Sequence, residues 1–313
     1  MKNTELHQIQ FSIIVCVYNC SITDLLNTLN SIIYQEDIVF QVVIADDFSH
    51  SNFLNKVDIY MRKNKFTNYL YIRNDTNLGT VNNILNAMQY CDGEYIKVIG
   101  SGDLLHDSHT LKQVYLYMIN NKYEICFGNG YSYKEENKNV YISKYYSPLV
   151  LKPYVNNQEN SIKKNLIIYG DQISGALTFY SKKCLLKYLK IISNKIIYVE
   201  DYIPRLAALD NIKIGYINRI VIFYQYGTGI STNINKKYND RLKKDEESFT
   251  ELIAKYGLEN SYVKEYLKFW ALRNELCILR IIKKIILQPS YLLYYFNSYL
   301  NLKRNFTNWK IFK

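Results

Sequence analysis

The chain has 313 residues, of which 48% are hydrophobic and 21% charged, so it can bury a full core and is not a disordered protein. It contains 12 Gly and 4 Pro but 32 Tyr and 13 Phe, a composition that excludes collagen-like and linker-like sequence. The formal net charge is +11, and residues 261–313 contribute +8 of it through ten cations and two carboxylates. The basic character therefore belongs to the C-terminal tail.

The six cysteines show no Cys-x-x-Cys pair and no regular spacing, and most lie in apolar stretches. This usage favours a reduced, cytoplasmic protein. The first ten residues contain no apolar leader, and Arg280, Lys283 and Lys284 interrupt the best candidate for a long apolar run. We therefore expect neither secretion nor a membrane-spanning helix.

Short β-rich runs alternate with helical patterns through the first hundred residues. We expect strands at Phe11–Tyr18, Phe40–Ala45, Tyr69–Arg73 and Tyr95–Ile99, and helices at Leu25–Ile33 behind a cap at Ser21 or Thr23, at Ser51–Met61 and at Gly79–Cys91. This alternation is typical of βαβ units in a parallel sheet, and hence of an α/β fold. Ligands of such sheets bind beyond the carboxyl ends of the strands. Tyr18-Asn19, Asp46-Asp47 and Gly100–Asp103 are therefore expected to meet in one crevice.

The remainder of the chain has a different character. Residues 131–170 are polar and irregular, which predicts a long excursion that serves as a lid or as an acceptor-binding segment. Further strands are expected at Gly175–Tyr180 and Ile214–Tyr224, and past Lys236 the chain is almost wholly helical in pattern. We therefore expect a catalytic domain at residues 1–235 and a helical, basic and aromatic-rich region at residues 236–313.

Three strand ends together carry a resemblance to a known family. One strand runs into Tyr18-Asn19, a second ends in Asp46-Asp47-x-Ser49, and a fourth runs into an acidic turn at Asp103. With the later segments VEDYIPRLAAL and YQYGTGIST, they resemble in order, over residues 11–233, the family 2 glycosyltransferases of the GT-A fold. The resemblance implies a Rossmann-like nucleotide-sugar-binding domain with a mixed, mainly parallel sheet, followed by a C-terminal helical region. It also implies a nucleotide diphosphate sugar donor, expected to be a UDP-sugar, and a bacterial surface glycan or lipid-linked glycan as acceptor.

The resemblance also assigns residues to the nucleotide. A carboxylate such as Asp47 accepts the imide hydrogen of uracil, while Asn19 and the adjacent backbone hold the ribose. On their own, Asp46 and Asp47 would rather indicate a cap on the following helix near residues 49–52, and only the ordered neighbouring motifs favour the nucleotide. For the segment from Arg73 to Gly79 the alternative is a glycine turn beside a solvated helix face. The candidate nucleotide-binding residues are Val17, Tyr18, Asn19, Asp46, Asp47, Arg73, Asn77, Gly79, Gly102 and Asp103.

Gly100-Ser101-Gly102-Asp103 departs from the Asp-x-Asp-Asp of the family, whose carboxylates hold Mg²⁺ or Mn²⁺ against the diphosphate. Asp103 is the one metal ligand that remains. Mg²⁺ commonly needs few protein ligands, so we expect a divalent ion to bind weakly without the donor. His106 and His109 lie nearby, but Asp107 and Ser108 are typical helix caps, so a histidine metal cluster is not favoured.

Glu200-Asp201 is the candidate catalytic pair. An inverting transfer needs a carboxylate to remove the proton of the acceptor hydroxyl. The resemblance gives this role to Asp201, with Glu200 as support or as an acceptor contact. If Asp201 is not the base, Glu200 and Asp171 are the next candidates. Glu200 and Asp201 are also typical of a helix start ahead of Pro204. The Gln-x-x-Arg-Trp signature of the processive synthases does not follow, so transfer of a single sugar is favoured, with a non-catalytic nucleotide-sugar-binding scaffold as the alternative.

The tail offers two interpretations. Tyr262–Leu287 is expected to form one amphipathic helix, with apolar positions on one side and cations near the opposite side: Leu272, Leu276, Leu279, Ile282 and Ile286 against Arg273, Arg280 and Lys284. The apolar side packs either on the catalytic domain or on an anionic membrane, at the inner face of the cytoplasmic membrane. No nucleic-acid recognition motif accompanies the charge, so a nucleic acid partner is not expected.

Overall fold

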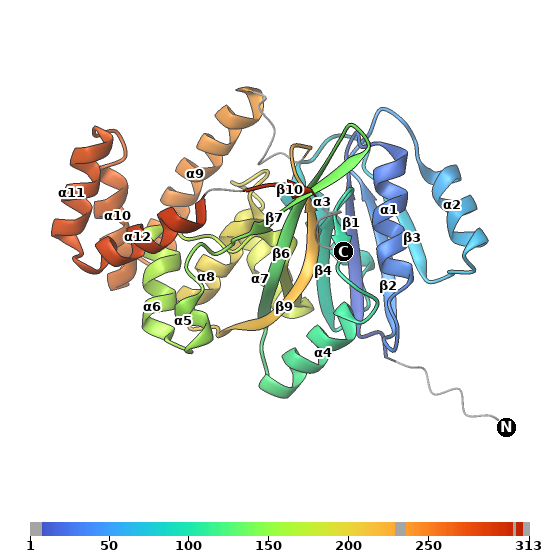
Figure 1. Cartoon of the computed structure of the whole chain (residues 1–313), viewed down its shortest axis with the longest axis horizontal. Helices are drawn as coiled ribbons and strands as arrows, with labels where there is room; N and C mark the ends of the chain where they lie inside the picture. Colours follow the sequence, from blue (N-terminus) through green and yellow to red (C-terminus); the bar gives the residue numbers. More distant parts are fainter. Residues whose placement is uncertain (1–7, 229–235, 303–304, 309–313) are drawn as a thin grey trace.

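The computed structural model describes residues 8–228, 236–302 and 305–308, and Figure 1 shows a twisted central sheet with helices around it and a further group of helices at one end. These residues form a 10-stranded sheet in the order β10-β7-β6-β8-β4-β1-β2-β3, with β9 beside β6 and β5. The strands β3, β2, β1 and β4 run parallel, and β8 pairs antiparallel with β4 and β6. The strands are β1 (Phe11–Val17), β2 (Phe40–Asp46), β3 (Tyr69–Arg73), β4 (Tyr95–Gly100), β5 (Leu104–Leu105), β6 (Ile125–Glu136), β7 (Asn139–Tyr145), β8 (Thr178–Ser181), β9 (Ile214–Gln225) and β10 (Thr307–Asn308). The expected α/β fold is confirmed.

Helices alternate with the parallel strands, as the sequence predicts. Those before residue 211 are α1 (Ile22–Ile33), α2 (Leu54–Lys63), α3 (Thr80–Ala87), η1 (Met88–Tyr90), α4 (Thr110–Asn121), α5 (Lys152–Val155), α6 (Glu159–Lys163), η2 (Lys164–Tyr169), η3 (Gly175–Leu177), α7 (Lys182–Ile192), η4 (Glu200–Tyr202) and α8 (Ile203–Leu209). The tail adds α9 (Lys236–Tyr256), α10 (Ser261–Ala271), α11 (Cys277–Leu287) and α12 (Ser290–Leu302). Ser21, rather than Thr23, caps α1, because its hydroxyl accepts from the Asp24 N–H at 3.0 Å.

One hydrophobic core joins the sheet to the first helices of the tail. The β1 and β2 strands are buried over nearly their whole length, as expected for parallel strands covered on both faces. Phe249 and Ile253 of α9, and Val263 of α10, are almost completely buried in the same core. The boundary expected at residue 236 therefore does not separate two cores.

Three expected segments differ in the structure. Residues 131–170 are not irregular: β6 and β7 form a hairpin whose turn residues Asn137 and Lys138 both have positive φ, and α5, α6 and η2 follow. The expected strand Gly175–Tyr180 begins as the turn η3, because the Ser174 hydroxyl accepts from Ala176 N–H, and becomes β8 only at Thr178. The expected helix Tyr262–Leu287 is two helices, separated by a turn at residues 272–276.

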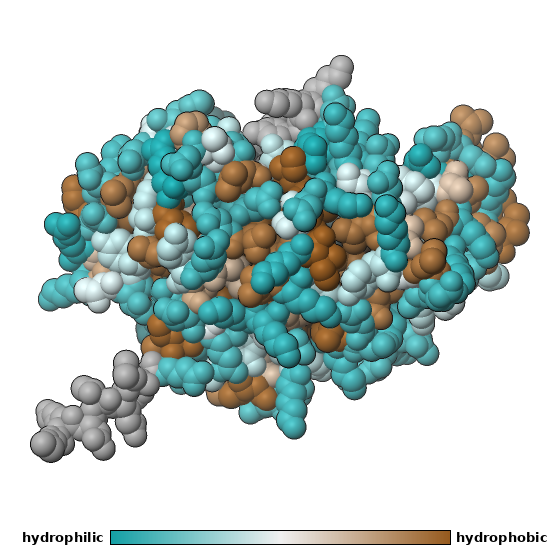
Figure 2. Space-filling model, turned by 180° about the vertical axis from the view of Figure 1, so that it is seen from behind, coloured by the Kyte–Doolittle hydropathy of each residue, from teal (hydrophilic) through white to brown (hydrophobic). Residues whose placement is uncertain are grey.

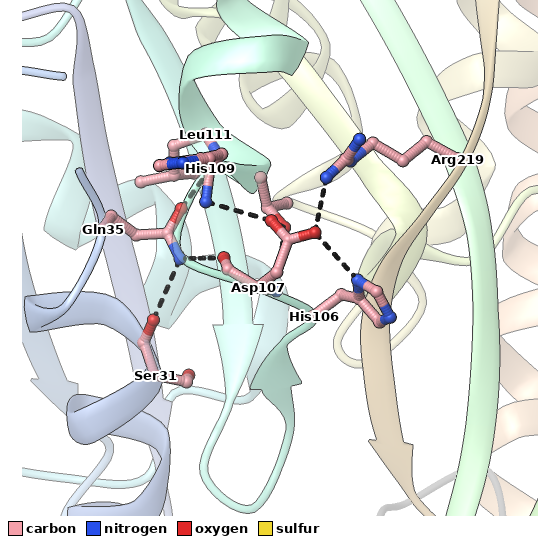
Figure 3. A network of polar contacts seen from close by, with 8 residues as sticks. Ser31, Gln35, His106, Asp107, His109, Leu111 and Arg219 are labelled. Atoms are coloured by element: carbon pink, nitrogen blue, oxygen red, sulfur yellow. Dashed lines mark hydrogen bonds and ion pairs between the residues drawn. The ribbon is translucent and has the colours of Figure 1, made fainter. Parts of the chain in front are cut away.

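The acidic and histidine-rich turn before α4 is structural (Figure 3). Asp107 accepts from His109 N–H at 3.0 Å and forms an ion pair with Arg219 at 2.5 Å, and its Oδ2 lies 3.1 Å from His106 Nδ1. The helix begins one residue after His109, whose side chain makes no cap hydrogen bond, and Gln35 Oε1 accepts from Leu111 N–H at 2.9 Å. The expected cap at Asp107 is therefore shared with Gln35, which lies 76 residues before Leu111 in the chain.

Candidate functional site

A cavity of about 1060 Å³ opens at the carboxyl ends of β1, β2 and β4 and extends to the helices of the tail. The end of β1 contributes Val17, Tyr18 and Asn19, the end of β2 contributes Asp47, and the turn after β4 contributes Asp103. The strand ends therefore meet in one crevice, as the parallel sheet predicts.

The carboxylate of Asp47 is fixed by hydrogen bonds from three groups of the protein. Its carboxylate accepts from Leu78 N–H at 2.8 Å, from Gly79 N–H at 2.9 Å and from the Asn74 side-chain amide at 2.9 Å. Gly79 has φ +79° and a Cβ there would lie 2.2 Å from Ile197 Cγ2, so a glycine is required. A carboxylate has about four acceptor positions. Asp47 thus orders the loop that carries Asn77 and Gly79 and keeps little capacity for a ligand.

The residues around Asp47 divide into those that line the cavity and those that support its edge. Asn19 lines it, with φ +48°, and its Oδ1 accepts from His50 N–H at 2.8 Å. Asp46 is completely buried and does not line the cavity, and its carboxylate accepts hydrogen bonds from Ser49 N–H and from the Tyr71 hydroxyl. Arg73 also lies outside it, donating to Ser49 O at 2.6 Å, with its guanidinium carbon 5.5 Å from the Phe48 ring.

The interpretation of the two aspartates as helix caps is wrong. The α2 helix begins at Leu54, with Phe53 in the cap position and no side-chain cap hydrogen bond. Asp46 instead closes the turn that ends at Ser49.

At Gly102, one of the two glycines that replace acids of the family's motif, both the backbone conformation and a neighbouring side chain oppose a larger residue. Gly102 has φ +101° and a Cβ there would lie 2.0 Å from Gln225 Oε1, so the Gln225 side chain occupies the space of an acid, and Gly102 itself does not line the cavity. At Gly100 an added Cβ would meet only Asp103 Oδ2, at 3.5 Å. Asp103 accepts from Gln225 N–H at 2.9 Å, and burial raises its pKa to about 7. The described residues contain no cluster of three or more metal-binding side chains.

The two acids Glu200 and Asp201 form the short turn η4 in the wall of the cavity. Asp201 Oδ1 accepts from Gly175 N–H at 2.5 Å, and a Cβ at Gly175 would lie 2.7 Å from Glu200 Oε1, so Gly175 lets both acids approach the backbone. Burial raises the pKa of both carboxyls, and the charge of Asp201 raises the pKa of Glu200 further. The Gly175 N–H opposes the rise for Asp201. The Gly175 N–H therefore favours the ionised form of Asp201.

A buried lysine stands among these acids. Lys97 of β4 is completely buried and donates to the carbonyl oxygens of Gly175, Ala176 and Thr178, at 3.2, 2.6 and 3.2 Å. Burial lowers its pKa to about 7, against the opposing charges of Asp103, Glu200 and Asp201. Lys97 thus fixes the loop beneath the acids and partly balances their charge.

Asp171 is excluded as a catalytic base by its contacts. Its two carboxylate oxygens accept from Leu149 N–H at 2.7 Å and from Val150 N–H at 3.1 Å. It is 2% exposed and does not line the cavity. Asp171 therefore holds the loop at residues 147–150.

Sequence reasoning missed two groups of residues. Lys97 is a cation in the middle of an apolar strand, and that position was the signal that could have found it. The tail residues that complete the cavity were expected in a separate helical region: Leu242, Lys243, Glu246, Tyr266, Phe269, Trp270, Arg273, Arg280 and Lys284. The element Tyr224–Ser231 falls partly outside the described residues, and Tyr224, Gln225 and Thr228 line the cavity.

Comparisons with known proteins agree with this geometry. A profile described as Glycosyl transferase family 2 matches residues 12–183, more than half of the chain. S. aureus TarS 1-349 in complex with UDP-GlcNAc aligns with a TM-score of 0.57 at 19% identity, over 90% of this chain and 82% of TarS 1-349. The mannosyltransferase PcManGT from Pyrobaculum calidifontis, in complex with GDP-Man and Mn²⁺, aligns with a TM-score of 0.57 at 11% identity, over 95% and 82% of the two chains. No curated protein sequence matches.

Proposed function

Because the chain belongs to glycosyl transferase family 2 and is a glycosyltransferase of the GT-A fold, we propose that it transfers one hexose or N-acetylhexosamine, with inversion, from a UDP-sugar. The proposed acceptor is a bacterial surface glycan or a lipid-linked glycan. The observation that carries the proposal is the position of Glu200 and Asp201, which share one cavity with Asp47 and Asp103 at the strand ends.

In this proposal Asp201 is the general base. The acceptor hydroxyl oxygen bonds to the anomeric carbon of the donor while the bond from that carbon to the phosphate oxygen breaks. The hydroxyl proton passes to the Asp201 carboxylate, and the bonding electron pair leaves with the nucleoside diphosphate. A single displacement inverts the configuration. The Gly175 N–H and the Lys97 charge support an ionised Asp201.

The residues fit a divalent cation held by few protein ligands. Asp103 is the carboxylate that would hold Mg²⁺ or Mn²⁺ together with the donor phosphates, and the cation would neutralise charge on the departing diphosphate. Burial raises the pKa of Asp103, so a cation bound beside it would favour its ionised form.

A nucleotide-sugar panel tests the proposed donor. UDP-sugars are expected to raise the melting temperature of the protein, and more so with Mn²⁺, whereas GDP-sugars raise it less, because a ligand stabilises the fold that binds it. Failure of every nucleotide sugar to stabilise the protein would overturn the proposal. Binding of a UDP-sugar without hydrolysis or transfer to any glycan would favour the scaffold alternative, which the reduced metal motif supports.

We further propose that the enzyme works peripherally, on the anionic inner face of the cytoplasmic membrane. None of the described helices is both long and apolar enough to cross a bilayer. The α11 helix has no buried residue. The side chains of Ile278 and Ile286 in α11 are 73% and 72% exposed, and that of Leu293 in α12 is 70% exposed. Figure 2 shows apolar side chains along the edge of the molecule that these helices form. An exposed apolar helix beside a net charge of +8 in residues 261–313 suits the boundary of an anionic membrane.

A further inference from the structure

Five cations line the end of the cavity next to the tail: Lys243 of α9, which is exposed, and four others. Arg205 of α8, Arg273 after α10, and Arg280 and Lys284 of α11 all line it. Within residues 8–228, 236–302 and 305–308, no carboxylate forms an ion pair with any of the four. Glu246 is the one acid that the described part of the tail adds to the lining. This end of the cavity therefore has a surplus of positive charge.

Arg205 is the most buried of the four. It is 4% exposed, and its guanidinium carbon lies 5.0 Å from the ring of Phe249 and 5.1 Å from that of Tyr266. Nη2 donates to Ile167 O at 3.2 Å, while Nε is buried without a hydrogen-bond partner. A buried guanidinium without a counterion is costly unless a ligand supplies the negative charge.

The cationic side chains of α11 lie on two different sides of the helix. Arg280 and Lys284 are partly buried toward the cavity, and Lys284 Nζ lies 5.1 Å from the ring of Phe269. Lys283, the next residue, is exposed and pairs with Glu275 at 2.6 Å. The two cations of α11 that line the cavity are therefore the two that have no carboxylate partner in the described part of the chain.

We propose, on the basis of the transferase function above, that this cationic end binds a phosphate or diphosphate group carried by the acceptor. Arginine guanidinium groups and a lysine ammonium group donate several charge-assisted hydrogen bonds, which the oxygens of a phosphate accept. In Figure 1 α10 and α11 lie at the opposite end of the molecule from β2, whose carboxyl end is one of those expected to hold the nucleotide. The chemistry fits a lipid diphosphate or a phosphodiester-linked glycan.

Trp270 provides the readout, because the Arg273 guanidinium carbon lies 4.6 Å from its ring. The chain has two tryptophans, so a Trp309→Phe background leaves Trp270 as the only one. Pyrophosphate is titrated into this protein at saturating UDP, and its binding is followed by fluorescence. The double variant Arg280→Gln/Lys284→Gln is compared with Lys283→Gln, a neighbouring cation that faces away from the cavity. Circular dichroism confirms that each variant is folded.

We expect the double variant to weaken pyrophosphate binding at least about tenfold, and Lys283→Gln to leave it within about twofold. Equal losses in the two variants, no binding at all, or displacement of pyrophosphate by UDP would each overturn the proposal. UDP affinity, measured separately, shows whether the donor site is intact, so failure of this site and failure of the transferase proposal are distinguishable. Farnesyl diphosphate and an oligomer of glycerol phosphate then serve as two arms, and the tighter binder identifies the source of the phosphate.

Discussion

The two ends of the cavity differ in how their charges are balanced. At the strand ends, the acids and Lys97 are fixed by hydrogen bonds from the protein, such as the three that Asp47 accepts and the three that Lys97 donates. At the tail, Arg205, Arg273 and Lys284 lie over aromatic rings, and neither they nor Arg280 have a carboxylate partner among the described residues. Under the proposals above, the first end is prepared by the protein before a substrate binds, whereas the second carries unbalanced positive charge until a phosphate binds.

The largest effect is expected at the prepared end. Asp201→Asn should lower kcat at least ~100-fold, because it removes the general base, while the UDP affinity stays nearly unchanged. Glu200→Gln is the matched control and should lose less. Turnover by Asp201→Asn close to that of the wild type would move the role of base to Glu200.

Lys97→Met tests whether the prepared end depends on its buried cation. The variant removes the ammonium group that donates to three carbonyl oxygens, so the free energy of unfolding should fall by about 3 kcal/mol in urea denaturation at neutral pH.

The pH dependence of that loss has a definite sign. The folded-state pKa of Lys97 is lowered to about 7, so between about pH 7 and its ordinary value near 10 the unfolded chain binds more protons than the folded one. The contribution of Lys97 to stability therefore rises with pH across this window. The deficit of Lys97→Met relative to the wild type should grow from pH 7 to pH 9, and a constant deficit would contradict the lowered pKa.

The two glycines of the reduced metal motif make a matched pair. Gly100→Asp should fold and bind Mn²⁺ several-fold more tightly in the presence of UDP, because its Cβ has room beside Asp103. Gly102→Asp should lose about 2 kcal/mol of stability, since the positive φ and the Gln225 side chain oppose it. Mn²⁺ affinity by titration and urea denaturation measure the two effects. Equal tolerance of both variants would show that Gln225 does not determine the motif.

The next expected effect is on liposome binding and depends on the exposed apolar side chains of α11. Ile278→Glu/Ile286→Glu should abolish flotation with anionic liposomes at low salt, because it removes apolar contacts and adds negative charge. The melting temperature should change little, since both side chains are exposed. Lys63→Glu on α2, remote from α11 in Figure 1, is the control for net charge. No flotation of the folded wild-type protein at any salt concentration would contradict the membrane proposal.

Arg73→Gln should have the smallest effect on ligand binding. Arg73 donates to Ser49 O and does not line the cavity, so the UDP affinity should change less than about twofold. A much larger loss of UDP affinity, measured by titration, would place Arg73 in contact with the nucleotide after all.

Much of the fold could be predicted because its signals are local. The β1 to β4 strands lie within a few residues of their expected positions, since β-branched runs and helical spacing alternate there. The β6–β7 hairpin was missed because its polar residues hide the alternation, and its two-residue turn contains Asn137-Lys138 rather than Asn-Gly.

Only one end of the candidate site could be predicted from the sequence. The positions of the strand ends follow from local sequence patterns, whereas the tail end depends on how distant helices pack. The strand ends follow from the rule for parallel sheets and from the family resemblance. The direction in which Arg280 and Lys284 point depends on the break at residues 272–276, which no glycine or proline marks. In a continuous helix the apolar side would pack inward by default, whereas the structure leaves that side exposed.

The network around Asp107 also bears on the order of folding. Its carboxylate joins the start of α4 to Arg219 of β9, 112 residues later, and Gln35 joins the end of α1 to the backbone of the same turn (Figure 3). Contacts between residues so far apart in the chain close large loops and tend to form late. A weakening of the Asp107–Arg219 pair should therefore speed unfolding more than it slows folding, so this ion pair contributes to the lifetime of the native state.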